Sequence, residues 1–242
     1  METDKSQKFW VFLQTLWMYI HLLDKGFENQ NRLHGTTTVG MVCTDGVVLG
    51  ADSRAMLGNY FIAHRNVRKI SKIDEHLGLT IAGGVADAQN IIDILRYNAS
   101  IYKLENFKPI PVASAARLTS NVFFSARLFP YIADVLVGGM DDKGPSLYDA
   151  DLFGNLTAAD YRSTGSGSPV AYGILETEYS KEINVHDGLR IAVRAVNAAI
   201  KRNAGTGDGF DVISITKSGF NSYPVEEKHK ILEEVAGRNH VG

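Results

Sequence analysis

The alternation of apolar and polar residues predicts a series of short strands after residue 36. Five apolar runs of strand length follow one another: 37–43, 46–51, 60–63, 69–73 and 79–82. Asp45-Gly46 separates the first two, and Asp-Gly between apolar runs is typical of a tight hairpin. The last run ends at Gly83-Gly84. The sequence therefore predicts a hairpin-rich β block at the start of the domain.

Helical periodicity follows this block. Apolar residues recur at helical spacing from Ile91 to Tyr102, and two prolines precede a second helix expected at about 112–128. Further helices are expected after the tight loop 164–169, around 189–200 and at 225–235. Further strands are expected at 133–140, 146–150, 155–158 and 211–216. Blocks of strands alternating with helix pairs indicate an α+β fold with helices layered on sheets, and not a parallel βαβ sheet.

Residues 1–35 differ from the rest of the chain. An apolar block from Phe9 to Ile20 contains both tryptophans and is followed by a polar linker. The block is shorter than the roughly 20 apolar residues of a spanning helix, and the linker lacks the small-residue site that signal peptidases prefer. We interpret 1–35 as an assembly-assisting propeptide that is removed from a domain at 36–242. The alternatives are an unused upstream start codon and a secretion signal.

Composition narrows the class of protein. The chain of 242 residues is 45% hydrophobic, which allows one sizeable core, and its net charge of −2 gives no reason to expect nucleic acid or an anionic membrane as partner. The single cysteine, Cys43, excludes an internal disulfide and the usual zinc clusters, and it favours a reducing compartment such as the cytoplasm. The glycine-rich piece 205–209 lacks the Walker lysine and the dinucleotide fingerprint, so phosphate binding is not indicated.

The candidate chemistry begins at Gly35-Thr36. An internal threonine is a weak nucleophile because its hydroxyl needs a base held beside it. Cleavage after Gly35 would free the α-amine of Thr36, whose pKa of about 7.7–8.0 suits proton transfer at neutral pH. One residue would then supply both nucleophile and base. The alternative is that three threonines simply begin an exposed strand, where threonine is favoured.

Several separated motifs share their order and spacing with one family. The motifs are Thr36–Gly40, Ala51–Ala55, Val67–Ile70, Ala82–Asp87, Leu136–Gly139 and Gly165–Pro169 with Tyr172-Gly173. From Thr36 to about Thr216 the chain resembles the catalytic β subunits of the archaeal 20S proteasome, which are N-terminal-nucleophile hydrolases. The resemblance implies a four-layer αββα sandwich and a threonine endopeptidase that requires no cofactor and no metal.

The resemblance implies roles for three residues around the scissile bond. Thr36 is the nucleophile, Lys69 lowers the pKa of its hydroxyl or relays its proton, and Asp52 holds Lys69. An ordinary surface ion pair is the alternative for Asp52 and Lys69. One extra residue precedes the lysine, so strict counting would select Arg68, whereas the local pattern selects Lys69. Because arginine cannot deprotonate in a protein, we choose Lys69.

Four further positions match the family's active site. Gly83 resembles the glycine whose N–H forms the oxyanion hole, with a plain turn as the alternative. Ser166 resembles the active-site serine, with a helix N-cap as the alternative. Asn203 stands where the family has aspartate, and Thr206 where it has serine. We expect Asn203 to keep the shape but to lose the charge and an orienting acceptor, which predicts a slower but active site.

An apolar specificity pocket is also implied by the matched positions. It would be lined by Ala55, Val67, Ile81 and Val85, with Lys69 at its edge. Their apolar character predicts cleavage after hydrophobic residues.

The resemblance further implies a set of partners. Four stacked heptameric rings would hold this subunit in the inner two and α subunits outside, and an ATPase cap would supply unfolded polypeptide. One rival is a β subunit that is never processed and only builds the ring, which Asn203 and the extra residue before Arg68 favour. Another is an N-terminal-nucleophile amidohydrolase acting on small amides, against which Gly165–Pro169 argues.

Overall fold

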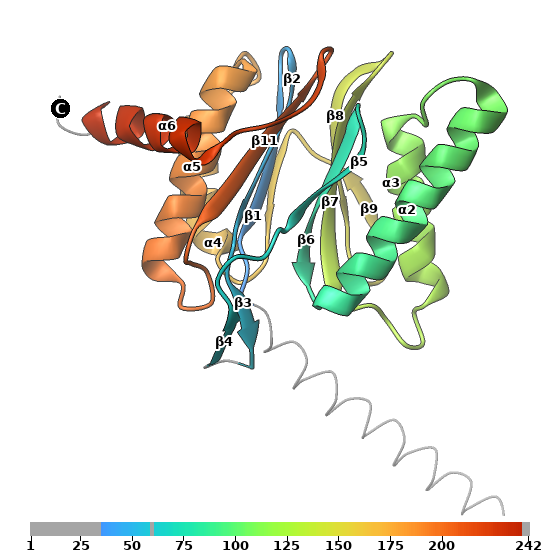
Figure 1. The fold of residues 1–242 in the computed structure, drawn as a ribbon, viewed down its shortest axis with the longest axis horizontal. Helices are drawn as coiled ribbons and strands as arrows, with labels where there is room; N and C mark the ends of the chain where they lie inside the picture. The colour runs from blue at the N-terminus through green and yellow to red at the C-terminus, as the bar shows by residue number, and fades with distance from the viewer. Residues whose placement is uncertain (1–34, 59–60, 239–242) are drawn as a thin grey trace, which may run out of the picture. The chain divides into compact units, whose positions relative to one another are not determined.

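The computed structural model describes residues 35–58 and 61–238 and shows four layers (Figure 1). Two antiparallel sheets face each other, helices α2 and α3 cover one of them, and α4 and α5 cover the other (Figure 1). A separate two-stranded hairpin, β3–β4, extends beside them. This arrangement confirms the expected α+β class and the αββα sandwich.

The elements have the following bounds. The strands are β1 (Thr38–Cys43), β2 (Gly46–Asp52), β3 (Ala55–Leu57), β4 (Phe61–His64), β5 (Ile70–Asp74), β6 (Leu77–Gly83), β7 (Ala133–Asp141), β8 (Gly144–Ala150), β9 (Leu156–Ala158), β10 (Tyr161–Thr164), β11 (Phe210–Thr216) and β12 (Gly219–Ser222). The helices are α2 (Val85–Asn106), α3 (Val112–Ser125), α4 (Ser168–Glu178), α5 (Val185–Arg202) and α6 (Val225–Arg238).

Strand register brings the start of β1 to the end of β2. The first sheet has the order β10-β1-β2-β11-β12 and the second β5-β6-β7-β8-β9. The expected Asp45-Gly46 hairpin joins β1 to β2 with Thr38 opposite Ala51. The pairing continues one residue outward, because the Asp52 N–H donates to the Thr37 carbonyl at 3.1 Å. Asp52 is thereby fixed beside the residues that precede β1.

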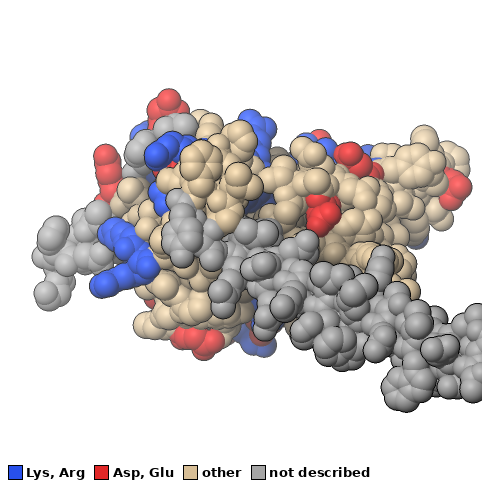
Figure 2. Space-filling view, turned by 90° about the horizontal axis from the view of Figure 1, so that it is seen from below, with Lys and Arg blue, Asp and Glu red and all other residues tan. Residues whose placement is uncertain are grey.

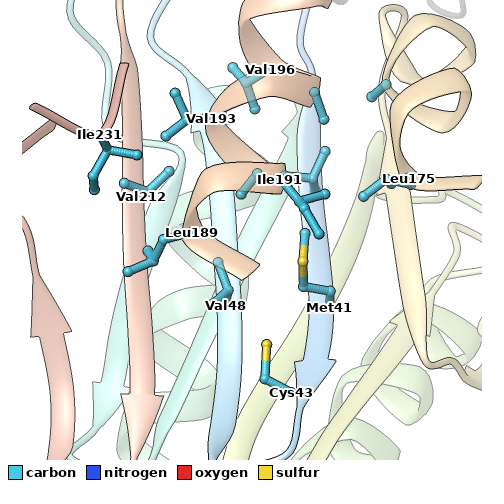
Figure 3. Packing of buried hydrophobic residues seen from close by; sticks show 14 of the residues in the cluster. Met41, Cys43, Val48, Leu175, Leu189, Ile191, Val193, Val196, Val212 and Ile231 are labelled. Atoms are coloured by element: carbon cyan, nitrogen blue, oxygen red, sulfur yellow. The ribbon is translucent and has the colours of Figure 1, made fainter. Parts of the chain in front are cut away.

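Helix α5 anchors the first sheet. Asn184 caps its N-terminus by accepting from the Asp187 N–H at 2.9 Å. Two basic residues lie in its last turn, where they interact favourably with the negative end of the helix dipole. Its apolar face buries Leu189, Val193 and Val196 against β1, β2 and β11 (Figure 3). Each such side chain stabilises the fold by about 1.5–3 kcal/mol when fully buried. The sheet end that carries Asp52 is therefore held on a rigid layer.

Two further apolar clusters complete the sandwich. One lies between the second sheet and helices α2 and α3 and includes Leu95 and Phe123. The other lies between the two sheets and includes Leu49, Leu136 and Ile215. The sheets are thus packed on both faces.

The structure corrects several expected boundaries. Strands β3, β10 and β12 were not expected, since each is short and has little apolar alternation. Helix α2 begins at Val85, well before the first apolar marker at Ile91, because its first turns are largely exposed. Helix α3 ends at Ser125 and not near Leu128. The expected propeptide at 1–35 falls, except for Gly35, outside the described residues.

Charged residues of both signs reach the surface (Figure 2), and the single cysteine is buried. On the face seen in Figure 2, outside the grey atoms, basic and acidic side chains are scattered over a mainly uncharged surface. Burial raises the pKa of the Cys43 thiol to about 12, and Asp45 and Asp187 contribute to this rise. No described helix combines the length and apolar character needed to cross a membrane.

Candidate active site

Thr36 lies buried just before β1, with its hydroxyl directed at the preceding peptide group. It is 4% exposed, and its Oγ1 donates to the Gly35 carbonyl oxygen at 2.7 Å. Its N–H donates to Ser166 Oγ at 3.4 Å. The hydroxyl is therefore next to the bond that would have to break to free the Thr36 amine.

Lys69 joins the Thr36 hydroxyl to Asp52. Its Nζ lies 2.8 Å from Asp52 Oδ1, 3.0 Å from Thr36 Oγ1 and 3.3 Å from the Gly35 carbonyl oxygen. The side chains of Lys69 and Asp52 are only 7% and 0% exposed, so the alternative of a surface ion pair is wrong. Burial lowers the pKa of Lys69, while the Asp52 charge and hydrogen bond oppose this change.

Asp52 receives four hydrogen bonds. Its Oδ1 accepts from Lys69 Nζ and the Thr37 N–H, both at 2.8 Å. Its Oδ2 accepts from the Gly207 N–H at 3.0 Å and the Arg54 N–H at 3.1 Å. A buried carboxylate requires such partners to remain charged. Asp52 thus fixes Lys69, the start of β1 and the loop containing Gly207 relative to one another.

The structure places Lys69, and not Arg68, at the threonine. Arg68 is exposed and lines a cleft with Lys72, whereas Lys69 is buried beside Thr36. In an extended backbone successive side chains point to opposite faces, so only one of two neighbouring basic residues can reach the site.

A second, uncharged cluster lies on the amine side of Thr36. Asn203 Oδ1 accepts from Ser166 Oγ at 3.0 Å, the Gly205 N–H at 3.0 Å and Thr206 Oγ1 at 3.1 Å. Its Nδ2 donates to the Ser166 carbonyl at 3.0 Å. Asn203 therefore keeps one orienting acceptor, Oδ1, while the charge and the second acceptor oxygen of an aspartate are absent, because the donor Nδ2 stands in the place of that oxygen.

Thr206 and Ser166 both belong to this uncharged cluster. Thr206 Oγ1 lies 2.8 Å from Thr37 Oγ1, so the cluster reaches the residue next to the nucleophile. The N-cap of α4 is Gly167, and no side chain caps that helix. The helix-cap alternative for Ser166 is therefore wrong.

Gly83 is required by the backbone at the end of β6. Its φ is +150°, and a Cβ at this position would lie 2.1 Å from the Ile132 carbonyl oxygen. It pairs with Ala133 within the sheet, so it is not a plain turn residue. Its role as oxyanion donor remains a prediction, because the backbone alone explains the glycine.

The four expected pocket residues differ in burial, and one of them, Ile81, is bonded to Lys69. The Ile81 N–H donates to the Lys69 carbonyl at 3.0 Å, and Ile81 belongs to the core under α2 and α3. Ala55 and Val67 are half-buried, and Val85 is 51% exposed at the start of α2. Their role in specificity remains a prediction.

Sequence reasoning missed Arg54 and Asp208 as supports of the site. Arg54 Nε donates to Asp208 Oδ2 at 2.6 Å, and Nη1 donates to the Ala204 carbonyl at 2.7 Å. Together with its N–H bond to Asp52, these contacts hold the loop that carries Asn203 and Thr206. The spacing Asp52-x-Arg54, typical of a carboxylate that accepts a local N–H, was the available signal.

Thr37 was the other missed residue. Its N–H is bound by Asp52 and its hydroxyl by Thr206, so it links the charged and uncharged clusters. Its place beside Asp52 follows from the β1–β2 register, which the expected hairpin could have supplied. Within the described part of the chain, no group of three or more His, Cys, Asp or Glu residues is placed to hold a metal ion.

Comparison with known proteins agrees with this geometry. The family model described as "Proteasome subunit" matches residues 33–215. "Proteasome subunit beta 2" of Nitrosopumilus maritimus (strain SCM1) is 54% identical over 201 residues, covering 83% of this chain and 95% of the relative. "Proteasome subunit beta 2" of Pyrococcus furiosus is 46% identical over 204 residues, covering 84% and 98%. The chain therefore belongs to the proteasome subunit family, as a β subunit of the archaeal type.

Proposed function

We propose that this subunit is a threonine endopeptidase that frees its own nucleophile by cleavage between Gly35 and Thr36. The observation that carries the proposal is the position of Lys69 Nζ, within 3.3 Å of Asp52, the Thr36 hydroxyl and the Gly35 carbonyl oxygen. Proteolysis by a proteasome subunit fits the family, and the threonine mechanism rests on these contacts.

Self-cleavage would begin with attack of Thr36 Oγ1 on the Gly35 carbonyl carbon. The lowered pKa of Lys69 increases its neutral fraction, and a neutral amine 3.0 Å from Oγ1 can accept the hydroxyl proton. The C–N bond then breaks, the proton passes to the Thr36 nitrogen, and an ester joins Gly35 to Oγ1. Water hydrolyses this ester, which leaves the Gly35 carboxylate and a free Thr36 amine.

Peptide hydrolysis would follow the same steps on a second chain. The free Thr36 amine, next to Ser166 Oγ, would mediate proton transfer while Oγ1 forms the acyl-enzyme. Gly83 would donate its N–H to the oxyanion, and Ala55, Val67, Ile81 and Val85 would favour hydrophobic residues before the cleaved bond. No metal or organic cofactor takes part in these steps.

The proposed setting is the proteasome core in the cytoplasm. Seven-membered rings of β subunits would be closed by rings of α subunits, and an ATPase cap would supply unfolded polypeptide. Synthesis as a precursor would keep the active site closed until the subunit lies inside this chamber.

Intact mass after co-expression with an α subunit tests the proposal. Loss of residues 1–35 is expected in the parent chain, together with hydrolysis of peptides ending in leucine, tyrosine or phenylalanine. Thr36→Ala should keep the precursor mass and lose hydrolysis, whereas the control Thr36→Ser keeps a hydroxyl and should retain part of both. A persistent precursor in the parent chain would instead support the rival, an unprocessed ring-building subunit. The absence of a carboxylate at position 203 favours that rival.

A further inference from the structure

The nitrogen of Thr36 lies in a buried position that disfavours charge. Under the proposed function, cleavage after Gly35 turns this nitrogen into a free α-amine, whose ordinary pKa is about 7.7–8.0. Thr36 is 4% exposed in the uncut chain, and burial of an amine favours its neutral form over the ammonium. Negative charge on a neighbouring element would be needed to restore the ammonium. The carboxylates around Thr36 therefore decide the pH at which the amine becomes neutral.

The amine side of Thr36 carries no charge. The Thr36 nitrogen lies 3.4 Å from Ser166 Oγ, which in turn lies 3.0 Å from Asn203 Oδ1. One hydroxyl thus separates the nitrogen from the Asn203 amide. A Cβ built on Gly205 would lie 3.3 Å both from Asn203 Oδ1 and from the Gly35 nitrogen, so the amide borders the volume that Gly35 would leave. The freed amine would therefore meet a neutral amide on this side.

The direction of these hydrogen bonds suits a neutral amine. Ser166 Oγ donates its single hydrogen to Asn203 Oδ1, so it can only accept from the Thr36 nitrogen. An amine N–H that points at Ser166 leaves the nitrogen lone pair available to the proton of the Thr36 hydroxyl. Asn203 therefore orients the amine without adding charge to its surroundings.

The carboxylates on the hydroxyl side already have cationic partners. Asp52 lies 2.8 Å from Lys69 Nζ in the buried ion pair. Asp208 is bound by Arg54 and by Arg65, each at 2.6 Å. Each of these two negative charges thus lies next to at least one positive charge. Neither carboxylate is left to stabilise an ammonium at the nucleophile.

Helix α5 contributes charges of both signs near the amine side. Asn203 is its C-cap residue, and the negative end of the helix dipole would favour an ammonium. Lys201 and Arg202 lie in the last turn and oppose this effect. The end of α5 therefore does not replace a carboxylate at position 203.

The second sheet carries two carboxylates at its active-site end. Asp134 lies opposite Ala82 on β6, and Asp87 in the first turn of α2 accepts from a backbone N–H just before β7 at 2.8 Å. Burial first, and then Asp149 and Asp151, raise the pKa of Asp134 to about 6. Asp134 would thus titrate in the same range as an amine of lowered pKa. Its substitution is therefore a necessary control.

We propose that Asn203 keeps the freed Thr36 amine neutral at weakly acidic pH. An aspartate at position 203 would hold the amine as an ammonium there, so the amide extends peptide hydrolysis to lower pH. Only the neutral amine can accept the hydroxyl proton, and a carboxylate one hydroxyl away would favour the charged form. Asn203 is a positioning residue, because it acts through Ser166 and touches no reacting atom. The inference rests on the proposed function and adds to it the pH range in which the subunit works.

The pH dependence of peptide hydrolysis tests this inference. The subunit is co-expressed with its α subunit, and kcat/KM for a peptide ending in leucine is measured from about pH 5 to about pH 9. The acid limb of the parent should lie about one pH unit below that of Asn203→Asp. Relative to its own alkaline plateau, the parent should then be about five- to tenfold faster than the variant near pH 6. On that plateau Asn203→Asp should be at least as active as the parent. Coinciding acid limbs would overturn the inference.

Two neutral substitutions separate the charge from other causes. Asn203→Ala removes the amide without adding a carboxylate, so it should lower the rate at every pH and leave the acid limb in place. Asp134→Asn removes the carboxylate whose pKa is about 6, and it too should leave the limb in place. A limb that rises in Asn203→Ala as far as in Asn203→Asp would overturn the inference, because shape and not charge would then set it. A limb that disappears in Asp134→Asn would belong to Asp134 and would overturn it as well.

Chemical labelling measures the amine without catalysis. Acetic anhydride reacts with a neutral amine and not with an ammonium, so the rate of Thr36 acetylation against pH, read by peptide mass, gives the midpoint directly. The midpoint of the parent should lie below the ordinary range of about 7.7–8.0, and that of Asn203→Asp about one unit higher. A parent midpoint within or above the ordinary range would overturn the inference, even where the variant fails to process.

The same samples distinguish this inference from the proposed function. Loss of residues 1–35 and peptide hydrolysis at about pH 9 in the parent support the function, whatever the position of the acid limb. A processed and active parent whose limb coincides with that of Asn203→Asp overturns the pH inference alone. A parent that keeps residues 1–35 overturns both, because no free amine forms.

Discussion

Two polar clusters flank Thr36, and they differ in charge. On the hydroxyl side, Lys69 and Asp52 form a buried ion pair whose carboxylate accepts four hydrogen bonds. On the amine side, Asn203 joins Ser166 and Thr206 through an amide whose oxygen accepts three hydrogen bonds. The same kind of positioning is achieved with charge on one side and without it on the other. Under the proposed function, the charged side would take the hydroxyl proton during self-cleavage, and the neutral side would orient the Thr36 nitrogen.

Loss of the lysine should have the largest effect. Lys69→Met keeps the length of the side chain but removes the proton acceptor, so peptide hydrolysis should fall about 10²–10⁴-fold and the precursor mass should persist. The buried Asp52 would lose its counterion, which should lower the free energy of unfolding by about 3–5 kcal/mol. Denaturant unfolding and intact mass measure the two effects. Rates within a factor of two of the parent would remove Lys69 from the mechanism.

The second-largest effect should be a change in the pH dependence of the rate when Asp52 is substituted. Because burial lowers the pKa of Lys69 from 10.5 and Asp52 opposes this, Asp52→Asn should lower that pKa further and shift the acid limb of the self-cleavage rate to lower pH. In the parent, the unfolded chain holds more protons than the native chain between the two lysine pKa values, so stability should rise with pH in that window. A pH–rate profile with an unmoved limb would contradict the assignment.

The neutral cluster should respond more to loss of shape than to gain of charge. Asn203→Ala removes one acceptor and one donor, so Ser166 should lose its fixed position and turnover should fall about 10- to 100-fold. Asn203→Asp keeps the acceptor and should be at least as active as the parent, at a stability cost of about 1–3 kcal/mol from the lost bond to the Ser166 carbonyl. An inactive Asn203→Asp would show that the amide nitrogen is essential.

The smallest effect on turnover is expected from substitution of Thr206, whose hydroxyl donates to the side-chain amide of Asn203. Thr206→Val leaves the Thr37 hydroxyl without its partner, so the free energy of unfolding should fall by about 1–2 kcal/mol while turnover changes less than tenfold. The control Thr206→Ser keeps the hydroxyl and loses only a methyl group. Thermal unfolding compares the two. Greater destabilisation by serine than by valine would mean that packing, and not hydrogen bonding, is the main contribution.

Local patterns in the sequence predicted most of the fold, whereas the candidate site residues came from the resemblance to a family. The Asp45-Gly46 hairpin and the apolar face of α5 follow from short-range spacing, and so do the strands they position. Strand β12 is a short edge strand that follows β11 directly and has little apolar alternation. Strand β10 carries no short-range signal, because it is held by β1, which lies far away in the chain. Arg54 and Thr37 were missed for the same reason: their roles depend on a loop about 150 residues later. The orientation of the Asn203 amide likewise depends on contacts that no local pattern contains.

The close contact between Gly35 and Gly205 has a consequence for activation. A Cβ at Gly35 would lie 2.1 Å from the Gly205 carbonyl oxygen, so only a glycine fits at this position. Departure of Gly35 would vacate that volume and would leave Lys69 without one of its three acceptors. Maturation would then free the Thr36 amine and would also clear the volume that the acyl part of a peptide substrate needs. If the proposed self-cleavage holds, Gly35 of an uncut subunit would occupy this volume itself and would compete with a peptide substrate for it.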